Sequence, residues 1–200
     1  MLLVVLAGNG NGVPLGGLLV LVWAWGSRTP WSEIGFARPR SWIAVVAVGV
    51  LLGVVLKLIL KAIVMPLLGA DPVNPTYHYL AGNRAALPGA VWAMIVCAGF
   101  GEEAVFRGFL FERFGKLLGS GTRAKVVIVV VVSVVFGASH YLDQGLPGMQ
   151  QATIVGLVFG SIFAVTRRIW MLMVAHASFD LAALAIIYFD VESKVAHLCF

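Results

Sequence analysis

The sequence predicts an all-α fold, a polytopic transmembrane helix bundle of about six spans with room for additional interfacial helices. Of its 200 residues 60% are hydrophobic and only 12% are charged, whereas soluble domains carry about 25% charged residues. The mean hydropathy is +0.98, and several apolar runs approach the roughly 20 residues that cross a bilayer. Because an open strand edge cannot satisfy its backbone in lipid, we expect all of these runs to be helices.

Six spans are expected within one integral-membrane domain, residues 1–200, since no polar stretch is long enough to form a second core. Their expected ranges are 13–26, 41–68, 87–112, 126–141, 149–166 and 169–189. The short apolar stretch at residues 1–12 lacks the basic start of a signal peptide. We expect it to extend the first span backwards or to form a short extracytoplasmic lead.

Basic residues occupy alternate loops between these spans. The loops expected to be cytoplasmic carry Arg28, Arg38 and Arg40, then Arg113, Lys116, Arg123 and Lys125, and finally Arg167 and Arg168. Cytoplasmic loops are enriched in Lys and Arg, so both termini are expected outside. The same distribution accounts for the net charge of +5 and predicts no nucleic-acid partner.

Lys57 and Lys61 lie in the second span and share one face, because they are four residues apart. This face could line an aqueous cavity. Alternatively, both side chains could snorkel to the membrane interface while their stems stay in lipid. The second interpretation is favoured.

Ionisable residues also interrupt three other spans, where each costs about 2.5–3.5 kcal/mol on insertion scales and therefore indicates a function. They are Glu102, Glu103 and Arg107 in the third span, His140 at the end of the fourth, and His176 with Asp180 in the sixth. On separate helices, these groups can satisfy one another only by converging in the interior of the bundle.

Helical spacing assigns different neighbours to the two adjacent glutamates. Glu103 and Arg107 are four residues apart and are expected to form a supporting ion pair. Glu102 is rotated by about 100° from Glu103, so it is expected to face another helix. A helix rise of about 1.5 Å per residue puts His140 roughly 10 Å from the depth of His176. A fourth helix that extends past Tyr141, or an orientation less regular than the basic loops suggest, would reconcile the two.

Two hydrolytic schemes fit this set of side chains. A carboxylate beside an imidazole can act as a general base toward water, and an imidazole can stabilise an oxyanion. Alternatively, Glu102, His140 and His176 could ligate a divalent metal such as zinc and leave one position open for water. An ion- or proton-coupled transporter could use the same charges as a relay, although no internal repeat supports it. A catalytically silent immunity or scaffold relative is the third alternative.

The ordered motifs resemble a known family. Glu102-Glu103-x-x-x-Arg107, Phe136-x-x-x-His140 and His176-x-x-x-Asp180 are similar to those of the CAAX prenyl proteases and bacteriocin-processing (Abi) endopeptidases of the CPBP family. The resemblance covers a catalytic core of about residues 88–189. It implies a glutamate-dependent intramembrane endopeptidase, and members are also described as metalloproteases.

The resemblance also implies roles for individual residues. Glu102 would activate the water, and His140 would help to hold it. His176 and Asp180 would stabilise the oxyanion or order the imidazole, while Glu103 and Arg107 would fix the helix. The prenyl-protease branch typically has Asn at the position of Asp180. An ionised Asp cannot donate a hydrogen bond, so ordering His176 is the role expected for Asp180.

A membrane-associated or lipidated peptide is the substrate that this resemblance implies, cleaved near the membrane surface. The chain is expected to be a multi-pass protein of a prokaryotic inner membrane, because it is compact and shows no additional domain.

Overall fold

The computed structural model describes residues 12–199, and every regular element among them is helical. Three helices are uninterrupted: α2 (Val13–Gly26), α7 (Thr122–Ser139) and α9 (Trp170–Tyr188). A fourth, α8 (Tyr141–Thr166), has a break at Gly145. Another continuous helix joins α3 (Trp42–Ile59), η1 (Leu60–Val64) and α4 (Met65–Leu67). The longest joins η3 (Arg84–Ala86), α5 (Leu87–Trp92), η4 (Ala93–Glu102), η5 (Ala104–Leu110) and α6 (Phe111–Leu118). Two short helices complete the set, η2 (His78–Leu80) and α10 (Glu192–Ala196).

Within residues 12–199, five helices are long and apolar enough to cross a membrane. They are Trp42–Leu67, Arg84–Leu118, Thr122–Ser139, Tyr141–Thr166 and Trp170–Tyr188. The first expected span, α2, is also apolar, but its 14 residues make only about 21 Å of helix. Its expected backward extension falls mainly on residues that the structure does not describe. The prediction of a polytopic helical bundle is confirmed.

The boundary between the fourth and fifth helices lies earlier than predicted. α7 ends at Ser139, and α8 begins at Tyr141 where the sequence suggested residue 149. The fourth helix therefore does not extend past Tyr141, and in α8 the backbone breaks again at Gly145, which adopts φ 63° and ψ −163°. A positive φ is readily available only to glycine, and Pro147 follows two residues later. The backbone therefore leaves helical geometry a few residues after His140.

The helix that carries the glutamates is wider than the regular α-helix that we expected. Residues Ala93–Glu102 and Ala104–Leu110 form π-type turns, which are rare and frequently occur at functional sites. Small residues let neighbouring helices pack closely here. A Cβ on Gly101 would lie 2.8 Å from the Val13 carbonyl oxygen, and a Cβ on Gly99 would lie 3.0 Å from that of Met173. α2 and α9 therefore lie directly against this helix.

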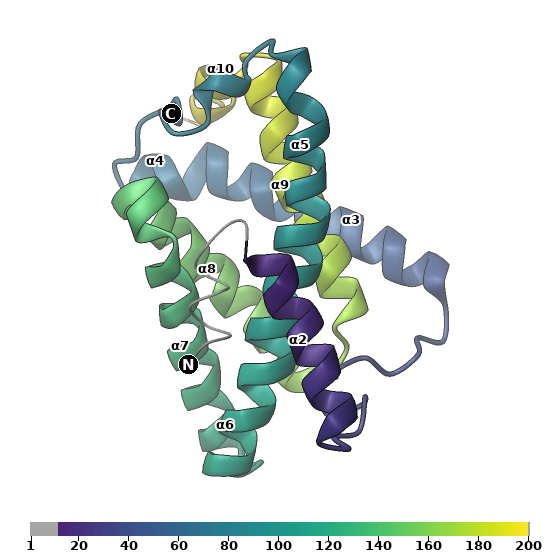
Figure 1. The fold of residues 1–200 in the computed structure, drawn as a ribbon. Helices are drawn as coiled ribbons and strands as arrows, with labels where there is room; N and C mark the ends of the chain where they lie inside the picture. The colour runs from purple at the N-terminus through teal and green to yellow at the C-terminus, as the bar shows by residue number, and fades with distance from the viewer. Residues whose placement is uncertain (1–11, 200) are drawn as a thin grey trace.

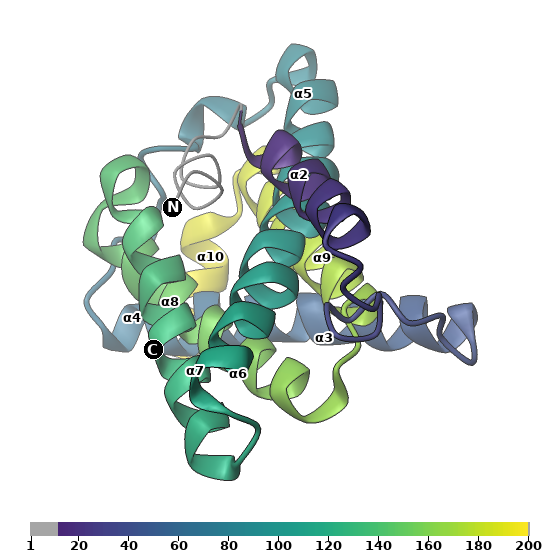
Figure 2. The ribbon, with the colours of Figure 1, turned by 60° about the horizontal axis from the view of Figure 1, so that its bottom comes forward.

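α3 runs across the bundle, whereas α2, α7 and α9 run along its length (Figures 1 and 2). It crosses α9 at two glycines. A Cβ on Gly53 would lie 2.1 Å from the carbonyl oxygen of Ala175, and a Cβ on Gly49 would lie 2.8 Å from the side chain of Val174. This close crossing packs the second half of α3 directly against α9, the sixth expected span.

The three basic segments meet at one end of the molecule, the lower end in Figure 1. Lys116 Nζ lies 3.5 Å from Glu33 Oε2, and Ile169 N donates to Gly35 O at 3.1 Å. The alternation of basic loops along the sequence thus corresponds to one common end of the bundle.

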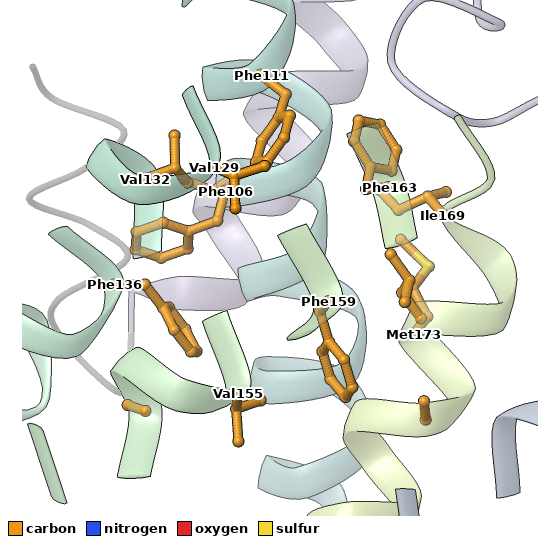
Figure 3. Packing of buried hydrophobic residues seen from close by; sticks show 14 of the residues in the cluster. Phe106, Phe111, Val129, Val132, Phe136, Val155, Phe159, Phe163, Ile169 and Met173 are labelled. Atoms are coloured by element: carbon orange, nitrogen blue, oxygen red, sulfur yellow. The ribbon is translucent and has the colours of Figure 1, made fainter. Parts of the chain in front are cut away.

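Phenylalanines form the centre of the core, around the helix Arg84–Leu118 that carries the two glutamates (Figure 3). Phe106 packs edge-to-face on Phe136 with ring centroids 4.9 Å apart, and Phe111 packs in the same way on Phe163 at 5.2 Å. Such pairs contribute about 0.5–1.5 kcal/mol beyond the area that they bury. They hold η5, α6, α7 and α8 together around the site.

Candidate active site

A hydrogen-bonded trio supports the site from behind. Arg107 Nη1 donates to Glu103 Oε1 at 2.8 Å, as the four-residue spacing predicts. His176 Nδ1 lies 2.7 Å from the same oxygen, and since an ionised carboxylate only accepts, this ring nitrogen carries the proton. Glu103 and Arg107 are fully buried, at 0% and 1% exposure. Glu103 therefore joins the third span to the sixth.

Two core phenylalanines hold this trio in place. The Arg107 guanidinium lies 4.7 Å from the centroid of the Phe136 ring and 5.7 Å from that of Phe159, within the range of cation–π attraction. The same two rings contact the imidazole of His176 edge-on, at 5.9 and 5.8 Å. Both phenylalanines are visible in Figure 3. The orientation of His176 is thus determined by packing as well as by Glu103.

The other ring nitrogen of His176 faces two more carboxylates. His176 Nε2 lies 3.7 Å from Glu102 Oε2 and 3.8 Å from Asp180 Oδ2. Both distances exceed a direct hydrogen bond, but a single water can bridge such separations. The direct hydrogen bond that orients His176 comes from Glu103, although the sequence suggested Asp180 for that role. Glu102 and Glu103 thus both face His176 of the sixth span, at different ring nitrogens, whereas the rotation between them predicted different neighbours.

His140 joins the site from the end of α7. Its Nδ1 lies 2.8 Å from the carbonyl oxygen of Phe136, which can only accept, so this nitrogen also carries the proton. The ring packs on the side chain of Phe136 at 4.8 Å. Both histidines therefore contact the same phenylalanine ring, and each has its Nε2 left for a ligand. Both imidazoles line the same cavity, so the predicted difference in depth excludes neither of them from the site.

These side chains line one internal cavity of about 540 Å³. All four candidate catalytic residues contribute to its wall: Glu102, His140, His176 and Asp180. The supporting residues Glu103 and Arg107 lie behind that wall. Cavities of about 300–1,000 Å³ are typical of small-ligand sites, so several residues of an extended peptide would fit.

The two lysines of the second span face this cavity, so the favoured snorkelling interpretation is wrong. Lys57 is only 8% exposed, and its Nζ donates to Gln151 Oε1 at 3.1 Å. Lys61 Nζ donates to Glu192 Oε1 at 3.0 Å. The lysine stems do not run through lipid, because α3 crosses α9 closely and its lysine-bearing face points to the cavity.

Three further residues of the cavity wall were not anticipated from the sequence: Tyr77, Gln151 and Glu192. Glu192 is 2% exposed, although its position in a polar tail suggests a solvated residue. Burial raises the pKa of Tyr77 to about 12, and the negative charge of Asp180 adds to this effect. The Tyr77 phenol thus remains protonated and able to donate. No short-range pattern marks these residues, since their partners are distant in the chain.

The fit to a metal ion is partial. Both histidines use Nδ1 for a hydrogen bond and leave Nε2 available, as zinc-ligating histidines do. However, no three His, Cys, Asp or Glu side chains within residues 12–199 converge closely enough to hold a metal. In this arrangement Glu102, His140 and His176 do not converge into a metal site.

Together, the fold and the site define an integral membrane protein with an internal cluster of carboxylates and imidazoles that opens into a cavity. Carboxylates and imidazoles are the side chains that most often act as general acids and bases in catalysis. The class of protein is therefore a membrane-embedded enzyme in which water can reach buried ionisable groups.

Comparison with known proteins identifies the family. Residues 84–182 match the family model described as "Rce1-like: Type II CAAX prenyl endopeptidase Rce1-like", a segment that contains all four candidate catalytic residues. The chain belongs to this family and is a CAAX-type intramembrane protease. Searches of the curated proteins and of the solved structures found no match.

Proposed function

We propose that the protein is a glutamate-dependent endopeptidase in which Glu102 activates a water molecule for attack on a peptide bond. One observation carries the proposal. Glu102 Oε2 is buried and has no hydrogen-bond partner among residues 12–199, yet it lies 3.7 Å from His176 Nε2 at the wall of the cavity. A water between these two atoms would be positioned by both.

The proposed reaction needs only this water and the side chains of the chain. Glu102 accepts a proton from the water, and the resulting hydroxide attacks the carbonyl carbon of the scissile bond. The carbonyl oxygen becomes an oxyanion in the tetrahedral intermediate. Glu102 then returns its proton to the leaving nitrogen, and the bond between carbon and nitrogen breaks. The products are a carboxylic acid and an amine.

The histidines have complementary roles in this scheme. Glu103 holds the Nδ1 proton of His176, and the Phe136 carbonyl holds that of His140. Each Nε2 can therefore accept a hydrogen bond from water, or donate to an oxyanion when the ring is protonated. We assign His140 to holding the water together with Glu102 and His176, and we assign His176, beside Asp180, to stabilising the intermediate that forms from it.

A peptide attached to or embedded in the membrane is the proposed substrate. The family is described by its prenyl endopeptidase activity, so a lipidated peptide is the first substrate to test. Apolar residues of the cavity wall, such as Met94, Phe179 and Ile187, suit hydrophobic side chains. A prokaryotic cell membrane as the location stays a prediction.

The proposal is tested with purified protein in lipid vesicles and two fluorogenic peptides. One peptide ends in S-farnesylcysteine followed by three residues, and the other is its unlipidated counterpart. Glu102→Gln keeps the shape of the side chain but cannot accept the proton, so cleavage should fall by about 10²–10⁴-fold. His140→Ala and His176→Ala should also abolish cleavage, while the unfolding temperature of Glu102→Gln stays that of the wild type.

Full cleavage by the Glu102→Gln variant would show the mechanism to be wrong. A wild-type protein that is folded but cleaves neither peptide would favour a silent relative. Metal analysis of the active protein, with chelator challenge, separates the two ways of activating water. Activity that a chelator removes and zinc restores would assign water activation to a metal.

A further inference from the structure

Lys57 presents a buried positive charge to the cavity without an acidic partner. Its side chain is 8% exposed, and its Nζ donates to the neutral oxygen of Gln151 at 3.1 Å. Its other contact is the face of the Phe179 ring, 4.9 Å from Nζ to the centroid. No Asp or Glu oxygen of residues 12–199 lies within 4.0 Å of this ammonium group.

Lys61 provides the comparison within the same helix. It lies one turn further on and lines the same cavity, but it has a full set of partners. Its Nζ contacts Glu192 Oε1 at 3.0 Å and the carbonyl oxygen of Pro72 at 2.7 Å. Glu192 is in turn held by the backbone N of Asn74 at 3.1 Å. Lys61 is thus paired with a carboxylate in direct contact, whereas Lys57 is not, and Asp180 acts on its charge only from beyond 4.0 Å.

An ammonium group with no carboxylate in contact is costly to bury, because it loses much of its hydration. Such a charge is expected where a ligand supplies the opposite charge. The neighbouring Gln151 strengthens this argument. Its Oε1 accepts from Lys57, so its amide group still has two hydrogens to donate. Lys57 and Gln151 both line the cavity and together offer a cation and an amide donor.

We infer that Lys57, with Gln151 beside it, binds a carboxylate of the peptide substrate and thereby selects which bond is cleaved. The inference rests on the proposed function. Phe179, on which the Lys57 ammonium lies, adjoins Asp180 and is less than one turn from His176. Phe179 thus links Lys57 to the part of α9 that carries His176 and Asp180. A carboxylate bound by Lys57 would therefore lie near these groups, and the scissile bond would lie within a few residues of that carboxylate.

Lys57 is not part of the segment that matches the family, residues 84–182. It is supplied by α3, which reaches the cavity only because of the crossing at Gly53. The carboxylate can come from the free C-terminus of the peptide or from an Asp or Glu side chain. The first source makes the enzyme one that removes a short C-terminal piece.

The experiment compares three versions of one farnesylated peptide: a free C-terminal carboxylate, a C-terminal amide, and an amide with Glu as its last residue. A close charge pair in a buried site strengthens binding by about tenfold or more, so the wild type should prefer the free carboxylate over the plain amide by at least about tenfold in kcat/KM. The third peptide identifies a side-chain carboxylate as the source if it is cleaved as well as the first.

Lys57→Met should remove this preference and cleave the free carboxylate and the amide at equal kcat/KM. The matched control is the double variant Lys61→Met/Glu192→Gln, which removes the neighbouring ion pair from the same cavity and should keep the preference. If Lys57→Met does not fold, Lys57→Gln and the wild-type ratio itself remain decisive. A merely structural role of Lys57 would lower both rates and leave their ratio unchanged.

The inference is overturned if the wild type cleaves the free carboxylate and the plain amide equally and gains nothing from the added Glu. It is also overturned if Lys57→Met keeps the preference for the free carboxylate. The outcome is separate from that of the proposed function. Glu102→Gln should lower all rates without altering the relative binding of the three peptides, which fluorescence anisotropy measures on the inactive protein. Loss of cleavage therefore tests Glu102, and the ratio between peptides tests Lys57.

Discussion

Adjacent glutamates have opposite environments at the residue scale. Glu103 accepts from Arg107 and His176 through one oxygen, and it is completely buried. The side chain of Glu102 is 14% exposed and lines the cavity. A carboxylate whose partners are fixed stabilises the fold, whereas one that faces a cavity can exchange protons with water. The two should therefore respond differently to substitution.

Glu103→Gln is predicted to destabilise the protein strongly. The substitution leaves the buried Arg107 charge without its counter-charge, and breaking a buried pair costs about 3–5 kcal/mol. The folded yield and the thermal unfolding temperature in detergent should both fall clearly.

Glu33→Gln is the matched control, because Glu33 pairs with Lys116 while its side chain is 45% exposed. Surface pairs contribute about 0–1 kcal/mol, so this variant should unfold near the wild-type temperature. A Glu103→Gln protein as stable as Glu33→Gln would contradict the structural role assigned to Glu103.

At the scale of elements, the crossing of α3 over α9 determines what enters the cavity. The backbones approach so closely that only glycine fits at residue 53. Small residues at such crossings are characteristic of helix packing in membranes, where backbones pack directly. Without this crossing, the Lys57 side chain would not reach Gln151 on α8.

Gly53→Ala is predicted to separate these two helices. The added Cβ would lie 2.1 Å from the Ala175 carbonyl oxygen, which is backbone and cannot move aside alone. Overpacking of this kind costs about 1–3 kcal/mol, so the unfolding temperature should fall and any preference for a free carboxylate should weaken.

Gly89→Ala is the control within a helix, since a Cβ at Gly89 meets nothing within 4 Å. Alanine has the higher helix propensity, so this variant should be as stable as the wild type or slightly more so. Equal stability of the Gly53 and Gly89 variants would mean that the crossing is not tightly packed.

The whole molecule has a basic end and an opposite end that carries the C-terminal segment (Figure 1). The basic end joins the loops after α2, α6 and α8, through contacts such as Lys116–Glu33. Because Lys and Arg are enriched on the cytoplasmic side, this end is expected inside and α10 outside.

Labelling with a membrane-impermeant maleimide tests this orientation in intact cells or spheroplasts. Cys199 is exposed and Cys97 is buried, so the wild type should label from outside at Cys199. In a Cys199→Ser background, Ser120→Cys at the end of α6 should label only after permeabilisation. Labelling of both positions from the same side would show that the two ends do not face opposite compartments.

The sequence by itself determined the helices and the ionisable residues that they carry. Apolar length predicted six spans, which the structure has as five long helices and the shorter α2. The four-residue spacing predicted the pair of Glu103 and Arg107. These features are local, since the pitch of a helix decides which residues share a face. The motifs also identified the family without any knowledge of the packing.

Only the tertiary structure decided what each face meets. It joined His176 to Glu103 rather than to Asp180, moved Lys57 and Lys61 from the expected membrane interface to the cavity wall, and added Gln151 and Glu192 from distant segments. The physical reason is that helical periodicity determines which side chains point together, whereas the neighbour that covers them depends on helix crossings. At α3 the close approach at Gly53 turned two apparently interfacial lysines into residues of the cavity.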